Sequence, residues 1–344
     1  MSESSYKAAG VDIDAKYAAV AAAKQAIRTT FTSGVVSDIG LFGGLFDAAR
    51  VGAGDQLLVA STDGVGTKVL VAAEAERYDS IGHDIVNHSI NDVLVQGARP
   101  LFFLDYVGTG KLDPAVVTQI LQGMAAACQV GKCALLGGET AEMPGLYHDG
   151  HFEIVGTIVG AVARDRVLDG SKVRDGDAVL SLPSNGLHTN GYSLARRVLF
   201  EQQGFGLDDS PHGLGVSLVD ALLAPHRSYL EPVLPLLEKG SSVHACAHIT
   251  GGGVLDNLPR VLPAGLGAEL RKDSVEVPDI LRLITELGQV DDSEAYRVFN
   301  MGFGFLLVVD PTEVDTVLAS LRAAGEDARE VGRITGDLDG VCVV

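Results

Sequence analysis

The residues best suited to chemistry lie in a polar, glycine-rich segment at 61–68, STDGVGTK, between an expected strand at 57–60 and a helical pattern through Ala75. Backbone N–H groups at the start of such a helix can hold an anion. Because Asp63 would repel a bare phosphate, the segment favours a phosphate bound together with a divalent cation, as in magnesium-nucleotide chemistry. The glycine spacing matches neither a Walker A loop nor the dinucleotide-binding GxGxxG motif. Similar turns without a ligand are also common.

Two further carboxylates lie near the ends of expected secondary-structure elements. Asp92 is late in a helix expected at 80–96, and Glu139 follows Gly137-Gly138 after an expected strand at 133–136. Magnesium takes one or two carboxylates together with phosphate oxygens, so oxygen ligands of this kind suit it. Asp92 and Glu139 therefore join Asp63 as candidate metal ligands.

The helix expected at 80–96 carries four polar side chains within about 100° of one another, a sector that follows from helical spacing. They are Asp84, His88, Asn91 and Asp92. Such a stripe is either a solvent-exposed face or, on an otherwise buried helix, part of a site. The apolar residues on most other sides of this helix favour a site.

The second half of the chain contributes two more candidate segments. His188 lies in the polar loop SNGLHTNG after an expected strand at 177–182, where a histidine is either functional or a satisfied core residue. Further on, His248-Ile249-Thr250 leads into Gly251-Gly252-Gly253 and a helix-like segment. Three glycines before a helix form either an anion-binding turn or a flexible connection, and the sequence leaves both open.

The remaining elements alternate between strands and helices, which indicates an α/β protein of two domains. A polar composition shift at 164–176 marks the boundary, so we expect domains at 1–170 and 171–344. The segment 33–54 is glycine-rich and expected to be irregular. Further strands are expected at 101–107, 152–163, 303–310 and 328–334, and further helices at 14–28, 114–130, 192–202 and 312–323.

Composition excludes several functions. The 344 residues carry 26 Lys and Arg against 45 Asp and Glu, a net charge of −19, so we expect no general affinity for nucleic acid or an anionic membrane. No apolar run approaches the roughly 18 residues of a membrane helix, and the first residues do not resemble a secretory signal. Four cysteines without a CxxC pair favour reduced thiols and a cytoplasmic location.

Seven segments along the whole chain resemble the phosphoribosylformylglycinamidine cyclo-ligase family, also called aminoimidazole ribonucleotide synthetases. They are SYKAAGVDID at 5–14, STDGVGTK at 61–68, NDVLVQGARPLFFLDY at 91–106, GGETAEMPGLY at 137–147, LHTNGYSL at 187–194, HITGGG at 248–253 and YRVFNMGFG at 296–304. The span from Asp92 to Pro100 fits the DxxxxGAxP signature of a wider ATP-using superfamily. GGETAEMPG, HITGGG and FNMG are specific to the cyclo-ligase family.

The resemblance implies a fold and a reaction. The N-terminal half would form a half-barrel sheet with helices that pairs with its copy in a homodimer, and the C-terminal half a layered α/β domain. ATP would lie in a cleft near the dimer interface. The family uses ATP to close the imidazole ring of formylglycinamidine ribonucleotide in purine biosynthesis, giving aminoimidazole ribonucleotide, ADP and phosphate.

The resemblance also implies roles for individual residues. Catalytic roles fall to Lys24, Lys68, His188 and Asp92, the two lysines by neutralising phosphate charge and His188 by stabilising or protonating the transferring group. Magnesium would be held by Asp63, Asp92 and Glu139. Contacts to ATP are implied for Asp63, Gly64, Gly66, Thr67, Lys68, Asn91, Gly137, Gly138, Glu139 and Thr140. Contacts to the substrate, including its ribose phosphate, are implied for His248, Thr250, Gly251, Gly252 and Gly253.

Other functions remain as alternatives. A selenophosphate synthetase would need a reactive cysteine near the N-terminus, whereas the first cysteine here is Cys128. A thiamine-monophosphate kinase would lack the GGETAEMPG and HITGGG segments, and the larger synthetase of the preceding step would need a much longer chain. A non-catalytic scaffold of the same fold should have lost the carboxylates that this chain retains.

Overall fold

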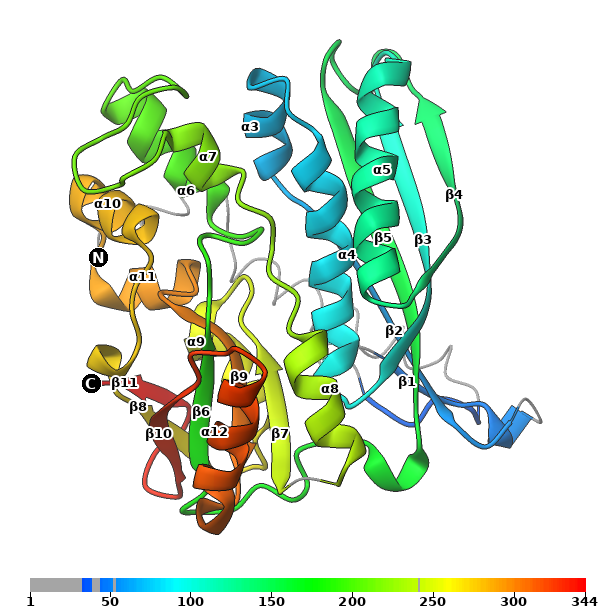
Figure 1. Cartoon of the computed structure of the whole chain (residues 1–344), viewed down its shortest axis with the longest axis vertical. Coiled ribbons are helices and arrows are strands. Elements are labelled where there is room, and N and C mark those ends of the chain that lie inside the picture. Colours follow the sequence, from blue (N-terminus) through cyan, green and yellow to red (C-terminus); the bar gives the residue numbers. More distant parts are fainter. Residues whose placement is uncertain (1–32, 39–43, 52–53, 241) are drawn as a thin grey trace.

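Two β-sheets, one in each half of the chain, organise the computed structural model, which describes residues 33–38, 44–51, 54–240 and 242–344 (Figure 1). The N-terminal sheet has the strand order β1-β2-β5-β3-β4, in which only β3 and β4 run parallel. Its strands are β1 (Gly44–Asp47), β2 (Leu57–Gly64), β3 (Arg99–Thr109), β4 (Ala134–Glu142) and β5 (Phe152–Val162). Its helices are α3 (Lys68–Glu74), α4 (Asp79–Leu94) and α5 (Pro114–Val130).

The C-terminal sheet has the strand order β11-β8-β10-β6-β9-β7 and carries helices around it. Strand β9, between β6 and β7, is apolar throughout and is buried at every position. The strands are β6 (Ala178–Pro183), β7 (Val243–His248), β8 (Gly267–Leu270), β9 (Phe303–Val309), β10 (Arg329–Thr335) and β11 (Val341–Val343). The α-helices are α6 (Tyr192–Arg196), α7 (Leu218–Leu222), α8 (Leu230–Glu238), α9 (Gly253–Asn257), α10 (Asp279–Gly288), α11 (Asp292–Val298) and α12 (Val314–Ala323).

Helix α4 lies between the two domains, with the N-terminal sheet on one side and the C-terminal domain on the other (Figure 1). Its apolar residues are fully buried, including Ile81, Ile85 and Ile90. It crosses α5 at two glycines: a Cβ on Gly82 would lie 2.1 Å from a carbonyl oxygen of α5, and one on Gly123 would lie 2.2 Å from a carbonyl oxygen of α4. The solvent-exposed alternative for the polar stripe of this helix is therefore excluded.

Three expectations about local structure need correction. Strand β2 continues through Asp63 to Gly64, because its backbone pairs with β5 as far as Val155. Strand β4 likewise includes Gly137 to Thr140, which were expected to follow the end of a strand at 133–136. Gly138 has a packing role, since a Cβ there would lie 2.2 Å from the Asp105 carboxylate. The segment expected to be irregular contains strand β1, which pairs with β2.

The other expected elements within the described residues agree with the pattern to within a few residues, whereas the helix expected at 14–28 lies outside the described residues. The helix expected at 192–202 is divided into α6 and a π-helical turn at Arg197–Gln202. The expected domain boundary at 170 and 171 falls in the segment between the last strand of the N-terminal sheet and the first of the C-terminal sheet. No described helix is long and apolar enough to span a membrane.

The segment at 224–229, which we call the strap, joins the C-terminal domain to α4. Three side chains of α4 bind its backbone: Asp84 Oδ1 accepts from the His226 N–H (2.6 Å), Asn87 Nδ2 donates to the His226 carbonyl (2.8 Å), and Asn91 Nδ2 donates to the Arg227 carbonyl (2.8 Å). Asn91 Oδ1 also accepts from the Tyr229 N–H at 2.9 Å. The strap thus completes its backbone hydrogen bonds with side chains rather than with a strand or helix.

A fully buried ion pair lies at the start of this contact. Lys68 Nζ is 2.9 and 2.8 Å from the two carboxylate oxygens of Asp84 and donates to the Ala224 carbonyl at 2.7 Å. Both side chains are 0% exposed. Burial lowers the pKa of the Lys68 ammonium and raises the pKa of the Asp84 carboxyl, and the attraction between the two groups opposes both shifts. Each charge is therefore stable in the interior only because the other is present.

We predict that Lys68→Met lowers the free energy of unfolding by about 3–5 kcal/mol, because it leaves Asp84 as an uncompensated buried charge. Urea unfolding followed by circular dichroism measures the change. Lys272→Met is the matched control, since the Lys272–Asp292 pair is exposed, with side-chain accessibilities of 55% and 78%. Its loss should stay below about 1 kcal/mol. An equally small loss for Lys68→Met would contradict the structural role of the pair.

Candidate active site

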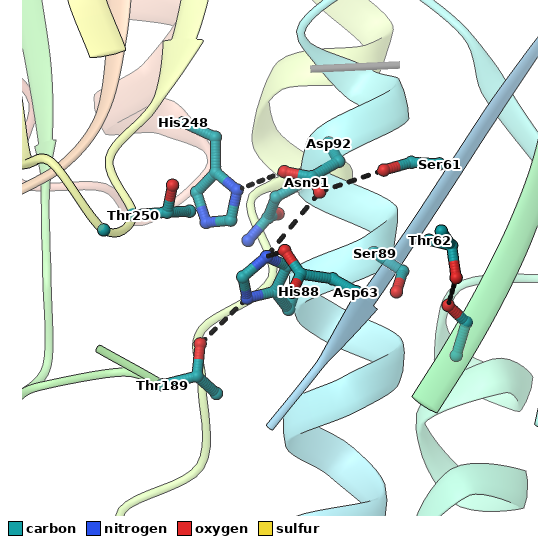
Figure 2. A network of polar contacts seen from close by, with 12 residues as sticks. Ser61, Thr62, Asp63, His88, Ser89, Asn91, Asp92, Thr189, His248 and Thr250 are labelled. Carbon is teal, nitrogen blue, oxygen red and sulfur yellow. Dashed lines mark hydrogen bonds and ion pairs between the residues drawn. The ribbon is translucent and has the colours of Figure 1, made fainter. Parts of the chain in front are cut away.

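Two of the three predicted metal-binding carboxylates meet at one histidine (Figure 2). Asp63 reaches toward α4 from β2, and its Oδ2 lies 2.9 Å from His88 Nε2. Asp92, one turn along α4 from His88, places its Oδ2 3.6 Å from the same nitrogen and accepts a hydrogen bond from Ser61 at 3.2 Å. The Asp63 side chain is 48% exposed, whereas that of Asp92 is 7% exposed. An exposed and a buried carboxylate therefore face the same point.

The charge of His88 follows from these neighbours. Burial by itself lowers the pKa of His88, but the Asp63 and Asp92 carboxylates outweigh it and raise the pKa to about 9. His88 is therefore an imidazolium at neutral pH and balances part of the negative charge of the two carboxylates.

A closed circuit of polar contacts continues from this point into the C-terminal domain. His88 Nδ1 lies 2.8 Å from Thr189 Oγ1, and Thr189 Oγ1 lies 3.3 Å from His226 Nδ1. His226 Nε2 lies 2.9 Å from His248 Nε2, and His248 Nδ1 donates to Asp92 Oδ1 at 2.8 Å. Figure 2 shows the His248–Asp92, Asp92–Ser61 and His88–Thr189 contacts. The circuit fixes the Asp92 carboxylate from both domains.

His188 borders this circuit. It is 2% exposed, and its ring stacks on that of His226 with centroids 4.2 Å apart. Burial, reinforced by the neighbouring His248, Lys68 and His88, lowers the pKa of His188 well below its ordinary value. The ring is therefore neutral near pH 7, so it can take part in hydrogen bonds but carries no positive charge. Its φ of 61° is in the left-handed region, which L-residues with a side chain seldom adopt.

Glu139 is not brought to the other two carboxylates within one chain. Asp63, Gly156, Asp105 and Gly138 lie in one row across neighbouring strands, so β2 and β4 are three strand spacings apart, roughly 14 Å. Glu139 follows Gly138, so its side chain points to the opposite face of the sheet from Asp63. A single magnesium ion cannot contact both within one protomer.

Two other predicted contacts are corrected by the structure. Lys68 was expected to neutralise phosphate charge, but its ammonium is enclosed with Asp84 and the Ala224 carbonyl. Asn91 was expected to contact ATP, but it is 0% exposed and both ends of its amide bind the strap. Both polar groups hold the domains together. Lys24, the other predicted catalytic lysine, lies outside the described residues.

The predicted ATP-binding glycines lie in two different environments. Gly66 has a φ of 69° and forms the turn before α3, and Thr67 Oγ1 lies 3.1 Å from Ser193 Oγ of the C-terminal domain. The Gly64 N–H donates a hydrogen bond to the Asp63 carboxylate at 2.7 Å. Gly137, Gly138 and Thr140 lie instead in edge strand β4, with Glu139.

The glycines of the predicted substrate segment form a tight turn. Gly252 and Gly253 have φ of 101° and 57°, and a Cβ on Gly253 would lie 1.9 Å from the Tyr296 carbonyl oxygen. Asn257 Nδ2 donates to the carbonyls of Thr250 and Gly251 at 3.3 Å each and of Gly253 at 2.8 Å. The turn is therefore rigid, which excludes the flexible connection. His248, at its start, is fully buried in the circuit.

Sequence reasoning did not select His226, Thr189 or Ser61, and it named His88 only as part of a polar stripe. His88 could have been selected because it lies four residues from both Asp84 and Asp92, on the same face of α4. His226 carries no local signal, since it lies in the apolar segment LLAPHRSYL. Only the packing of the strap on α4 brings it to the site.

Comparison with known proteins gives matches along nearly the whole chain. Residues 45–162 match the family model described as AIR synthase related protein, N-terminal domain, and residues 174–344 match the corresponding C-terminal domain. A phosphoribosylformylglycinamidine cyclo-ligase of Desulfitobacterium hafniense is 46% identical over 337 residues, covering 98% of each chain. One of Geobacter sulfurreducens is 46% identical over 329 residues, covering 96% of this chain and 94% of that one.

Solved structures share the fold at lower identity. The thiamine monophosphate kinase of Aquifex aeolicus is 17% identical, with a TM-score of 0.62 and coverage of 97% of this chain and 98% of that chain. Hydrogenase maturation protein HypE in complex with ATP is 21% identical, with a TM-score of 0.57 and coverage of 81% and 76%. At this identity, the likeness concerns the fold alone.

We predict that His88 makes the stability of the metal-free protein depend on pH. A pKa raised from the ordinary 6.5 to about 9 contributes stability that is complete below about pH 6.5 and is lost as the pH rises through about 9. The loss is at most about 3 kcal/mol. Urea unfolding in the presence of EDTA between pH 6.5 and 9.5 measures it, with His88→Gln as the control that lacks this component. Equal pH slopes for both proteins would refute the assignment.

Proposed function

The chain belongs to the phosphoribosylformylglycinamidine cyclo-ligase family, and we propose that it uses ATP to convert formylglycinamidine ribonucleotide to aminoimidazole ribonucleotide, with release of ADP and phosphate. The observation that carries the proposal is 46% identity to named cyclo-ligases over 98% of both chains. Retention of Asp63 and Asp92 on adjacent elements of one site argues against a scaffold that has lost its chemistry. The reaction belongs to purine biosynthesis, and a cytoplasmic location fits it.

The reaction requires activation of a poor leaving group. The formyl oxygen of the substrate attacks the γ-phosphorus of ATP, the bond to the bridging oxygen breaks, and ADP leaves. The ring-closing nitrogen then attacks the activated carbon, the C–O bond breaks with its electron pair on phosphate, and the nitrogen loses a proton. The task of the protein is to position the reactants and to neutralise the phosphoryl charge.

Asp63 and Asp92 fit a magnesium ion bound to ATP, because their oxygens converge on one point and Asp63 is open to solvent. Magnesium would supply neutralisation of the phosphate oxygens. The contact of Asp92 with His248 holds its carboxylate in place for that role. Glu139, on the opposite face of the sheet, is left out of this metal site.

His188 and the rigid turn after His248 are proposed to meet the substrate. A neutral, buried imidazole can donate a hydrogen bond to the oxygen on which negative charge develops during phosphoryl transfer. The turn at 250–253 fits recognition of the substrate phosphate through backbone groups, since the Asn257 side chain fixes its shape. Lys24 retains its proposed role in neutralising phosphate charge.

We also propose that two copies of the chain associate through the N-terminal sheet. Strand β4 is an edge strand, and an open edge invites pairing with another chain. Phe103 faces the helices and is fully buried, whereas its neighbour Leu104 on the opposite face is 37% exposed. Leu101 and Leu136 are also exposed, at 41% and 64%. A symmetric dimer would cover these apolar side chains and the edge.

The reaction is tested by measuring ADP release from MgATP with and without formylglycinamidine ribonucleotide, together with detection of aminoimidazole ribonucleotide as its coloured diazo adduct. We expect ADP and product in equal amounts, only with substrate. We expect Asp63→Asn to lower kcat at least about 100-fold, since it removes a magnesium ligand. The control Asp165→Asn changes an exposed carboxylate in the segment between the domains and should stay near wild type. ADP release without the product would contradict the proposed substrate.

The dimer is tested by light scattering during size-exclusion chromatography. We expect the unmodified chain to elute at twice the chain mass and Leu136→Asp to shift it toward the monomer, because a charge would replace an apolar contact. Val130→Asp is the matched control: Val130 is 73% exposed but lies at the end of α5, on the helical side. A monomeric wild type, or equal effects of the two variants, would count against this interface.

A further inference from the structure

Two buried cysteines meet where helix α5 turns into strand β4. Cys128 lies in the last turn of α5, and Cys133 directly precedes β4. Their exposed fractions are 2% and 6%, and both are free thiols. Neither belongs to the candidate active site, and no step of the proposed reaction uses them. The sequence does not mark them as a redox pair, because their spacing is not that of a CxxC motif.

The backbone between the two cysteines forms a well-defined helix C-terminal motif. The Cys133 N–H donates to the Cys128 carbonyl at 2.9 Å. The Lys132 N–H donates to the Gln129 carbonyl at 3.2 Å, and Lys132 is left-handed, with a φ of 51°. These features define a Schellman motif, in which the side chains at the positions of Cys128 and Cys133 frequently touch. The turn therefore brings two thiols side by side.

The two thiols differ in reactivity because one donates a hydrogen bond to the other. Donation from Cys128 to the Cys133 sulfur raises the pKa of Cys128, and burial and the nearby Asp105 carboxylate raise it further. The same hydrogen bond lowers the pKa of Cys133, although burial acts in the opposite direction. The thiolate is the nucleophilic form of cysteine. Cys133 is therefore the more reactive of the two, and it is also the more exposed.

We propose that Cys128 and Cys133 form a reversible disulfide on exposure to a peroxide, which makes the turn between α5 and β4 a redox-modification site. Because the two thiols already form a hydrogen bond, closure to an S–S bond of about 2.05 Å requires little movement of the backbone. The bond would tie the end of α5 to the start of the edge strand β4. The proposal goes beyond the cyclo-ligase reaction and does not depend on it.

The step balances with hydrogen peroxide as the oxidant. The Cys133 thiolate attacks one peroxide oxygen, the O–O bond breaks, and the hydroxide that leaves takes up a proton to form water. Cys133 is then a sulfenic acid. The Cys128 sulfur attacks the sulfenic sulfur, the S–O bond breaks, and the hydroxyl group leaves with the Cys128 proton as a second water. A dithiol reductant reverses the modification by thiol–disulfide exchange.

Lys132 makes the test direct, because trypsin cuts the chain between the two cysteines. Digestion places Cys128 in the peptide 112–132 and Cys133 in the peptide 133–164. The folded, reduced full-length chain is treated with hydrogen peroxide, the remaining thiols are alkylated under denaturing conditions, and the digest is analysed by mass spectrometry. We expect the two peptides to be joined with the loss of two hydrogen atoms and to separate after treatment with dithiothreitol.

Two variants separate the roles of the thiols. In Cys128→Ser the sulfenic acid has no second thiol to attack it, so dimedone should label Cys133. In Cys133→Ser, Cys128 should stay unlabelled. Cys246 is the control in the same molecule: it is fully buried, burial raises its pKa, and it should react at least about tenfold more slowly than Cys133. All measurements are made in a Cys342→Ser background, because the exposed Cys342 could link two chains.

Three outcomes would overturn the proposal: separately alkylated peptides after oxidation of the folded chain, oxidation of Cys246 as fast as that of Cys133, or dimedone on Cys128 instead of Cys133. In the first case the cysteines would form only the small apolar contact that accompanies such a turn. If a variant does not fold, the joined peptide from the chain with both cysteines still decides the matter. Because no measurement uses turnover, failure of the cyclo-ligase assay would not affect these results.

Discussion

The attachment of the strap at 224–229 to α4 is the constraint on which the rest of the structure depends. Polar side chains of the N-terminal domain hydrogen-bond to the strap backbone or to each other, inside an interface from which water is excluded. They are Lys68, Asp84, Asn87 and Asn91. The loss of one partner would leave a buried charge or a buried amide unpaired, which is energetically unfavourable. The two domains are therefore held in one relative position at α4.

That position creates the candidate active site. The acidic residues Asp63 and Asp92 come from the N-terminal domain, and Thr189, His226 and His248 come from the C-terminal domain. The circuit through these residues closes only when the domains are joined, since each histidine is held by a partner from another segment. Concentrating two carboxylates and four histidines in one interior region raises the pKa of His88 and lowers that of His188. Neighbouring histidines thus carry different charges because their environments differ.

Much of the fold could be predicted from the sequence, and the functional segments could be selected by their motifs. The apolar periodicity placed α4 and the strands β3, β5, β6, β9 and β10 to within a few residues, because burial of an apolar face is a local property of the pattern. It did not predict β1, β7 or β8. The prediction was wrong where glycines were taken to end β2 and β4, since their ladders with β5 and β3 continue through those glycines. Pairing with a partner strand is a tertiary contact, and it cannot be predicted from the sequence of one segment alone.

By itself the sequence determined the family, the overall α/β class and the residue types available for chemistry, because identity and periodicity belong to the chain. Only the tertiary structure decided what each polar side chain binds. Lys68 and Asn91 looked like ligand contacts yet hold the strap, Glu139 faces away from Asp63, and His226 joins the site from a segment without a motif. The physical reason is that a buried polar group must find a partner, and the partner is set by packing between elements distant in sequence.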